Sequence, residues 1–539
     1  MSKVLQLIGR INVPGPIRGD AYTCSGGILA SKQANQKSVY NLTNRYSPQR
    51  AWPEIAKDSR MVMYGLYDYV HNYLSTPITH ADIDEAADFM STAHSFGGPL
   101  AFDIKMWRRV VDEFGGHLPI MIQGLQEGST FFPNEPYVQV TSLAEGFGEI
   151  AAMIEANMVG LVSCATARAT ITRHWLDRMR EWVLRSMKSN ETIYTADKAL
   201  MEKVDGIARW MIHDFGMRAS STPEEAEIYG RAHLLSFHGT DTFSAAYQAW
   251  KMGAKRPTGT SILALAHRIV QGHSTEEEAY EAIFNAANGT IGSYVADCYD
   301  YKRAVKNFLI KLAKRGKGIV VARPDSGDWL ENAMFAAFEA YENGLYKTDE
   351  YGWKGPTNFT SINGDSMTPF ALNKIMSSRE DAGFNPVSWG IFGVGGYLRN
   401  NVTRDSLSSA YKLSACGNEN TPVVKLAAGR SKMSIPGPTV ISRLIHPVTG
   451  PIKTRSVFLD SEPEIKDVSD YVTYYNAGKA TIRDRFDIVQ DRAINEFDSF
   501  RNFPPEWGCD GKDVLSAAVI KIREEARKAH NLDYWSNVK

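Results

Sequence analysis

The sequence predicts an α/β protein whose core is an irregular parallel α/β barrel, accompanied by a flanking, discontinuous α+β domain. From about residue 205 to 404, short apolar runs alternate with helix-patterned stretches, which is typical of parallel strands joined by crossover helices. A small polar cluster follows most of these runs, at intervals of 26 to 40 residues, close to the length of one strand with its return helix. The carboxyl ends of successive parallel strands meet at one face of a barrel, where barrel enzymes keep their chemistry.

The elements of the barrel can be read in order along the chain. The predicted strands are 232–237 (AHLLSF), 260–267 (TSILALAH), 293–297 (SYVAD), 318–325 (GIVVARPD), 358–365 (NFTSINGD) and 389–396 (WGIFGVGG). The predicted helices are 241–253, 274–289, 301–316, 328–344 and 366–378. Ser274 with Glu277 three residues later is a capping-box pattern, and Gly316 marks a helix end.

The domain boundaries follow from where this alternation starts and stops. Residues 161–404 form the predicted barrel, and residues 1–160 and 405–539 are expected to combine into the flanking domain. The first of these two segments has turn-rich beginnings and a strand pattern at 37–42 (KSVYNL).

Composition excludes several classes of protein. With 43% hydrophobic residues, 22% charged residues and a net charge of −1, the 539-residue chain is an ordinary globular protein without a nucleic-acid-binding surface. Its five scattered cysteines contain no CxxC pair, which suits reduced thiols. The most apolar stretch, 148–165, includes Glu149 and Glu155, so it indicates a buried helix and not a membrane span. Since the N-terminal apolar run is too short for a signal peptide, we expect a soluble cytoplasmic protein.

The cluster RPDSGD (323–328) carries the clearest chemistry. Arg323 offers a fork of donors suited to a phosphate, and Asp325 could bind sugar hydroxyls; a strand-end ion pair is the alternative. In NGD (363–365), Gly364 lets a ligand approach the backbone and Asp365 adds a carboxylate, or caps a helix. GVGG (393–396) could cradle a phosphate on backbone N–H groups, or form a plain turn.

The remaining clusters have equally simple alternatives. Asp241 could accept a hydrogen bond from a ligand or cap a helix, while His267 and Asp297 could be structural. Phe215 could stack on a flat ring and Arg218 could neutralise an anion, or the two could serve packing and surface charge. Together, the clusters suit a phosphorylated sugar and an aromatic base. There is no Walker A motif or HExxH metal motif, and the DFG at 214–216 lacks the companions of a kinase.

These clusters, in this order, resemble those of the nicotinamide phosphoribosyltransferase family. HDFGMRASS, FHGTDT, ARPDSGD, NGD and FGVGG…TRD carry the resemblance, best from about Met211 to Arg404. It implies a type II phosphoribosyltransferase fold and a homodimer with its active sites at the subunit interface. It also implies transfer of phosphoribosyl from phosphoribosyl pyrophosphate (PRPP) to nicotinamide in NAD salvage, giving nicotinamide mononucleotide and pyrophosphate, with Mg²⁺ required.

The resemblance assigns a role to each cluster. It implies that Phe215 stacks on nicotinamide, Asp241 accepts from its carboxamide, and Tyr22 of the partner subunit covers the ring. Diphosphate would be held by Arg218, His267 and Arg323, and the ribose and 5′-phosphate by Arg323, Asp325, Gly364, Asp365, Gly395, Gly396 and Arg404. Arg45, Lys425 and Lys432 would be phosphate contacts from the partner. The catalytic set would be His267, Asp297 and Asp325, with Asp297 orienting His267 and ATP phosphorylating His267; the metal ligands stay unassigned.

Two alternatives stay open at this point. A nicotinate phosphoribosyltransferase shares the fold, but the Asp241 carboxylate would repel nicotinate while accepting an amide N–H₂. A non-catalytic ligand-binding relative would not need the complete set of sugar-phosphate residues. The chain also departs from the animal enzymes of the family, because Ala266 stands where they have an acidic residue.

Overall fold

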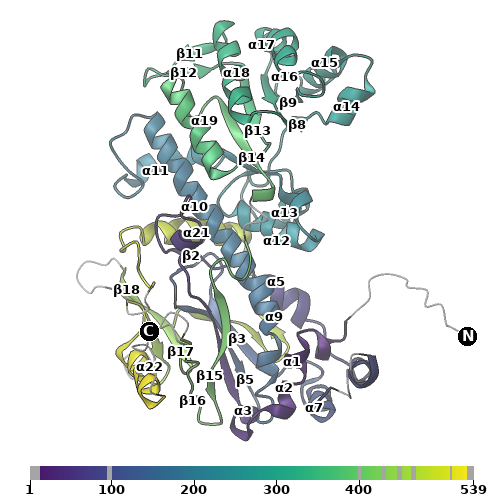
Figure 1. Ribbon diagram of the computed structural model, residues 1–539, viewed down its shortest axis with the longest axis vertical. Coiled ribbons are helices and arrows are strands. Elements are labelled where there is room, and N and C mark those ends of the chain that lie inside the picture. The colour runs from purple at the N-terminus through teal and green to yellow at the C-terminus, as the bar shows by residue number, and fades with distance from the viewer. Residues whose placement is uncertain are drawn as a thin grey trace, which may run out of the picture.

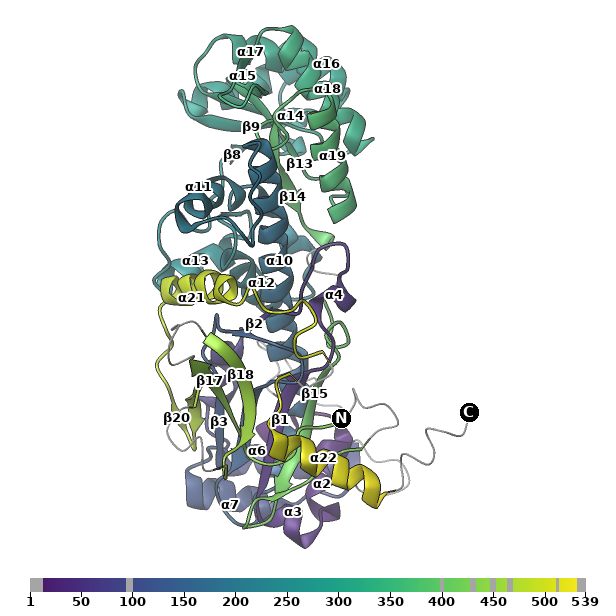
Figure 2. The same cartoon turned by 90° about the vertical axis from the view of Figure 1, so that its left-hand side faces the viewer.

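The computed structural model describes residues 13–93, 100–397, 402–426, 433–445, 452–462, 469–509 and 513–530. It has two lobes, one built on a parallel sheet and the other on an antiparallel sheet (Figure 1). The long helix α10 (Ser163–Ser186) runs from one lobe into the other. In the view turned by 90°, the parallel sheet again lies at one end and the short N-terminal helices at the other (Figure 2).

Seven parallel strands form the first sheet. They are β6 (Ile212–Asp214), β7 (Gly239–Thr240), β8 (Leu263–Ala264), β9 (Ile291–Val295), β10 (Ile319–Arg323), β13 (Phe359–Asn363) and β14 (Gly390–Val394). Because β14 pairs with β6, the strands follow one another around a ring in chain order. A single bridge between Gly239 and Thr260 joins β7 to the segment that enters β8. The predicted irregular barrel is confirmed, and among the described residues this is the one backbone bridge across its seam between β7 and β8.

Helices return the chain between these strands. They are α12 (Pro223–Leu234), α13 (Phe243–Lys251), α14 (His267–Gly272), α15 (Glu276–Ala287), α16 (Tyr301–Ala304), α17 (Ile310–Lys314), α18 (Trp329–Glu342) and α19 (Pro369–Asp381). Ile283, Ile310 and Ala336 from this layer share one buried cluster with the strand residues Val320 and Phe359. The alternation in the sequence therefore becomes an outer layer of helices that buries its apolar side against the barrel wall.

Two of the predicted strands and one predicted cap differ from the structure. Residues 232–237 are not a strand, because α12 continues to Leu234 and a turn follows. A short buried run suits either a strand or the end of a buried helix, and periodicity does not separate the two. Of residues 260–267, only Leu263–Ala264 form a strand, and α14 begins at His267. The cap of α15 is Thr275, one residue after the predicted position, which accepts a hydrogen bond from the N–H of Glu278.

The second sheet combines both ends of the chain. Its order is β16-β15-β1-β5-β3-β19-β20. The strands are β1 (Ser38–Asn44), β3 (Ile120–Leu125), β5 (Pro136–Ser142), β15 (Ser409–Cys416), β16 (Thr421–Pro422), β19 (Tyr471–Asn476) and β20 (Lys479–Ala480). Since β1 lies between β5 and β15, segments before and after the barrel form one antiparallel layer, as the predicted discontinuous α+β fold requires.

Shorter elements complete the flanking lobe. They are α1 (Ala21–Cys24), α5 (Leu66–Tyr69), α6 (His80–Asp88), α7 (Ile104–Phe114), α21 (Phe486–Ser499), α22 (Ala517–Ala529), the β2–β4 pair (Met61–Val62 and Thr130–Phe131) and the β17–β18 hairpin (Thr439–Ile445 and Ile452–Leu459). In the parallel lobe, β11 (Tyr346–Thr348) and β12 (Lys354–Pro356) form a small hairpin.

The predicted buried helix at 148–165 is confirmed as α8 (Ile150–Met153), α9 (Glu155–Asn157), η4 (Met158–Val162) and the start of α10. By length and composition alone, the continuous helical stretch 150–186 could cross a membrane. However, 56% of its most apolar window is buried inside the protein, as expected for the core helix of a globular fold.

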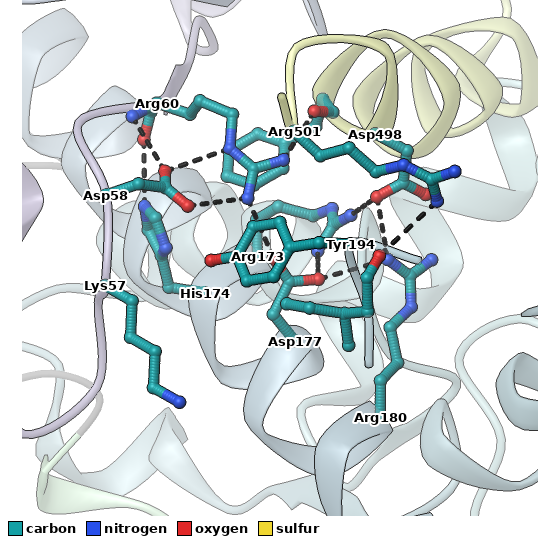
Figure 3. A network of polar contacts seen from close by, with 12 residues as sticks. Lys57, Asp58, Arg60, Arg173, His174, Asp177, Arg180, Tyr194, Asp498 and Arg501 are labelled. Carbon is teal, nitrogen blue, oxygen red and sulfur yellow. Dashed lines mark hydrogen bonds and ion pairs between the residues drawn. The ribbon is translucent and has the colours of Figure 1, made fainter. Parts of the chain in front are cut away.

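A network of buried ion pairs surrounds α10 (Figure 3). Arg173 contacts Asp177 at 2.6 Å and Asp498 of α21 at 2.5 Å. Arg180 contacts Asp498 at 2.9 Å and Asp205 of α11 (Lys198–Ala208) at 2.6 Å. Both arginines are buried, so each needs its carboxylate partners to offset the loss of hydration. The network therefore fastens α11 and α21 to the helix that joins the lobes.

Candidate active site

The carboxyl ends of the barrel strands open into one cavity of about 740 Å³. The predicted site residues that line it are Phe215, Arg218, Asp241, His267, Arg323, Asp325, Gly364, Asp365, Gly395 and Gly396. Asp297 does not line the cavity, but it contacts His267 from behind. Clusters that are far apart in sequence therefore meet at a single mouth, because each follows a strand of the same ring.

None of the four aspartates of the site is used as a helix cap. The N-caps of α13, α16, α18 and α19 are Thr242, Asp300, Asp328 and Thr368, respectively. The capping alternative for Asp241 and Asp365 is therefore wrong. Their carboxylates are left available to interact with a ligand in the cavity.

Asp241 is held by two hydrogen bonds to the same carboxylate oxygen. Nε2 of His213 lies 2.9 Å from its Oδ1, and the hydroxyl of Ser261 donates to Oδ1 at 2.5 Å. Burial alone would raise the pKa of Asp241, but these hydrogen bonds, with the charges of His213 and Arg323, lower it below its ordinary value. Asp241 is therefore ionised at neutral pH.

His213 and Ser261 are site residues that the sequence analysis missed. A signal for His213 existed, because it precedes Phe215 by two residues on a strand, and such residues point to the same face. No comparable signal marks Ser261, since its contact with Asp241 depends on how the segment before β8 crosses the seam of the barrel.

The ring of Phe215 lies directly over the backbone of β14. The backbone N–H of Phe215 donates to the carbonyl of Val394 at 3.0 Å, and a Cβ on Gly393 would overlap the ring. The His213 ring packs beside it, with centroids 4.8 Å apart. A Cβ on Gly239 would lie 2.6 Å from Nδ1 of His213, so that both rings depend on a glycine in the neighbouring strand.

His267 begins α14 between two carboxylates. Its Nε2 lies 3.2 Å from Oδ1 of Asp297, and its Nδ1 lies 4.0 Å from Oδ2 of Asp325. Asp297 is itself held from the other side, because the Ser326 hydroxyl donates to its Oδ2 at 2.5 Å. This arrangement fixes the imidazole ring while leaving its side chain partly exposed to the cavity.

The cations of the mouth differ in how firmly they are held. Nη2 of Arg323 donates to the carbonyl of Leu265 at 2.8 Å, whereas its buried Nε finds no hydrogen-bond partner within the described residues. Arg218, at the end of η5 (Gly216–Ala219), is exposed. An anion in the cavity would supply acceptors to Arg218 and to the donors of Arg323 that the Leu265 carbonyl does not use.

Tyr22, Arg45 and Arg404 do not line the cavity; they gather in the flanking lobe. Tyr22 lies on α1, which belongs to the lobe of the antiparallel sheet and not to the lobe of the barrel strands (Figure 1). Arg404 interacts electrostatically with both of the others. Burial lowers the pKa of Arg45, and the positive charge of Arg404 lowers it further. Glu155 raises the pKa of Tyr22, and Arg404 acts in the opposite direction. Tyr22 and Arg404 are both exposed.

The two predicted lysines can be placed only in part. Lys425 is exposed, after β16, where its backbone N–H donates to the hydroxyl of Ser434 at 2.8 Å. Lys432 lies outside the described residues.

Comparison with known proteins places the chain in a family. Residues 34–122 match the N-terminal domain of nicotinamide phosphoribosyltransferase, and residues 210–425 match the nicotinate phosphoribosyltransferase (NAPRTase) family. A nicotinamide phosphoribosyltransferase of Xanthomonas campestris pv. campestris is 30% identical over 363 residues, covering 65% of this chain and 72% of that protein. The chain belongs to the nicotinamide phosphoribosyltransferase family. Another relative with that name, from Acinetobacter baylyi, is 24% identical over 72% of this chain and 78% of its own.

Solved structures support the fold of this nicotinamide phosphoribosyltransferase family member. Human nicotinic acid phosphoribosyltransferase superposes with a TM-score of 0.58 at 15% identity, covering 94% of this chain and 99% of that one. Nicotinate-nucleotide pyrophosphorylase of Pyrococcus furiosus gives a TM-score of 0.55 at 14% identity, over 93% and 99%. At such identities the likeness establishes the type II phosphoribosyltransferase architecture and not the choice of base.

Proposed function

We propose that the protein is a nicotinamide phosphoribosyltransferase of NAD salvage, which transfers the phosphoribosyl group of PRPP to nicotinamide and releases pyrophosphate. One observation carries this proposal: a single cavity joins an aromatic ring and an ionised, ligand-facing carboxylate to a set of phosphate- and hydroxyl-binding groups. The first pair suits a flat base with an amide substituent, and the second set suits a ribose with phosphates at both ends.

The base would lie on Phe215 with its carboxamide toward Asp241. The ring of Phe215 is fixed over Gly393, and offset stacking of two rings contributes about 0.5–1.5 kcal/mol beyond buried area. An ionised carboxylate accepts a hydrogen bond from an amide N–H₂ but repels a second carboxylate. This pair therefore favours nicotinamide over nicotinate.

The sugar and phosphates of PRPP would occupy the rest of the cavity. Arg218, His267 and Arg323 would hold the pyrophosphate, and Asp325 with Asp365 the ribose hydroxyls. The backbone at Gly364 would approach the ribose, and Gly395 and Gly396 would contact the 5′-phosphate. Breaking the bond at the anomeric carbon builds positive charge on the sugar and negative charge on the leaving pyrophosphate. The chain's own contribution would be positioning and stabilisation of the leaving-group charge.

Mg²⁺ would enter with the substrate. Among the described residues, no group of three or more His, Cys, Asp or Glu side chains could hold a metal ion alone. Mg²⁺ commonly binds through one or two carboxylates together with substrate phosphates, and Asp325 and Asp365 line the same cavity as the proposed pyrophosphate groups. A bound ion would neutralise part of the charge on pyrophosphate.

ATP is the proposed activating co-substrate, and His267 is the residue that it would phosphorylate. The geometry supports this role in one respect. Asp297 occupies Nε2 of His267, so the other ring nitrogen, Nδ1, is the one left for reaction near the pyrophosphate groups.

A homodimer with shared sites would bring to the mouth the predicted site residues that do not line the cavity of their own subunit. Tyr22, Arg45 and Arg404 lie together in the flanking lobe, away from their own cavity. A second observation supports association: Phe243, Tyr247 and Trp250, on one face of α13 beside the mouth, have exposed fractions of 66%, 59% and 53%. Exposed apolar patches of this kind mark protein–protein contacts. We therefore propose that a second copy covers α13 and presents the Tyr22 cluster (Tyr22, Arg45 and Arg404), together with Lys425, to the cavity. The cytoplasm, with its PRPP and ATP, is the proposed location.

The alternative function is nicotinate phosphoribosyltransferase, which the fold of the human neighbour would also accommodate. Product analysis separates the two. The full chain is incubated with PRPP, Mg²⁺ and either nicotinamide or nicotinate, with and without ATP, and pyrophosphate and mononucleotide are measured. We expect turnover of nicotinamide, stimulated by ATP. Preferred use of nicotinate would favour the alternative, and no release of pyrophosphate with either base would indicate a ligand-binding relative.

A further inference from the structure

The two hydrogen bonds to Asp241 are unevenly distributed over its carboxylate. Both His213 and Ser261 bind Oδ1. Oδ2 makes no hydrogen bond within the described part of the chain, although the Asp241 side chain lines the cavity and is 38% exposed. The uneven arrangement leaves one oxygen tied to the barrel wall and the other free to accept from a ligand.

Resting on the proposed function, we propose that His213 and Ser261 are positioning residues that present Oδ2 of Asp241 to the bound base and so set the preference for a carboxamide over a carboxylate. The two donors come from different elements, His213 from β6 and Ser261 from the segment before β8. They hold the carboxylate from both sides of the β7–β8 seam. Because Oδ1 is held by both donors, the carboxylate cannot turn about its Cβ–Cγ bond, and the same oxygen, Oδ2, always faces the ligand.

The surroundings of each donor fit this positioning role better than a purely structural one. Ser261 is exposed and donates only to Asp241, so its hydroxyl contributes no buried packing. His213 is buried against Gly239, where any other residue would bring a Cβ to within 2.6 Å of its Nδ1. The lack of a side chain at that position keeps the imidazole in the plane from which Nε2 reaches Asp241.

The test compares base selectivity in the full-length enzyme and its variants. At saturating PRPP and Mg²⁺, kcat/KM is measured for nicotinamide and for nicotinate in the wild type, Ser261→Ala, Ser261→Thr and His213→Gln. Loss of one hydrogen bond to a charged acceptor should lower the nicotinamide-to-nicotinate ratio about ten-fold in Ser261→Ala. The change should appear in the KM for the base, with the KM for PRPP unaltered. Ser261→Thr keeps the hydroxyl and should restore the ratio.

The controls separate the possible failures. Ser377→Ala, on α19, removes an exposed hydroxyl that bonds only the carbonyl of Lys374, and its ratio should equal that of the wild type. Wild-type selectivity in both Ser261→Ala and folded His213→Gln would overturn the positioning role while leaving the transferase intact. A wild type that turns over neither base would overturn the proposed function itself. Thermal unfolding shows whether His213→Gln is folded. If it is not, the comparison of Ser261→Ala with Ser261→Thr decides alone.

Discussion

Gly393→Ala would measure how much the fixed Phe215 ring contributes to binding the base. An added Cβ would overlap Cδ2 and Cε2 of the ring and lie 3.4 Å from Cα of Gly364, whereas carbon atoms normally approach to about 3.5–4.0 Å. Since the backbone of β14 is held by its neighbours β6 and β13, the ring must move. Loss of offset stacking, about 0.5–1.5 kcal/mol, corresponds to a rise of about 2- to 12-fold in the KM for nicotinamide. The strain should also lower the free energy of unfolding by about 1–3 kcal/mol.

Initial rates at varied nicotinamide and varied PRPP provide the assay, with urea unfolding alongside. The KM for PRPP should stay close to the wild-type value, because the ring contacts only the base. Gly206→Ala in α11 is the matched control, since an added Cβ there meets no atom within 4 Å. It should leave both KM values unchanged and stabilise the helix by about 0.5–1 kcal/mol. An unaltered nicotinamide KM in a folded Gly393→Ala enzyme would refute the stacking role of Phe215.

Three other substitutions test separate parts of the molecule. His267→Ala should abolish the stimulation by ATP and leave some basal synthesis in a pyrophosphate-release assay; unchanged ATP dependence would refute the phosphohistidine assignment. Asp241→Ser should weaken nicotinamide use about ten-fold and relax discrimination against nicotinate, and intact selectivity would place the amide contact elsewhere. Asp177→Asn should lower the free energy of unfolding by about 3–5 kcal/mol in urea titrations, because it removes one of the carboxylates that offset the buried charges of Arg173 and Arg180. Burial raises the pKa of Asp177 but Arg173, Arg60 and Arg180 together hold it below its usual value, so its stabilising contribution is complete above about pH 4 and is lost as the pH falls further. The variant should therefore lose less stability than the wild type on acidification, and equal losses would argue against the ion pairs.

The barrel and most of its mouth could be predicted because strand, cluster and helix recur in chain order. Asp325 and Asp365 needed only a position at the end of a parallel strand to reach the cavity. The prediction of a strand at 232–237 was wrong, because the buried end of α12 has an apolar run that looks the same as that of a strand. Ser261 could not be found, since its partner Asp241 approaches it only across the seam of the ring.

The position of Arg404 shows the other limit of the sequence. It follows the end of β14 at Val394 by ten residues and was expected to join the 5′-phosphate group. The chain instead turns there toward β15 in the flanking lobe, where Arg404 approaches Arg45. A residue that closely follows a strand in the sequence can be expected to line the mouth only if the chain has not yet left the barrel.

Because the Tyr22 cluster is separated from the cavity of its own subunit, the number of working sites in a dimer would depend on which variants are mixed. If each mouth is completed by another copy, a subunit lacking Arg404 still has an intact cavity, and a subunit lacking His267 still has an intact Arg404. Mixing the two variants should then regenerate one complete, ATP-stimulated site in every heterodimer. Specific activity should also fall on dilution toward the dissociation constant of the pair, which would make enzyme concentration itself a determinant of catalysis.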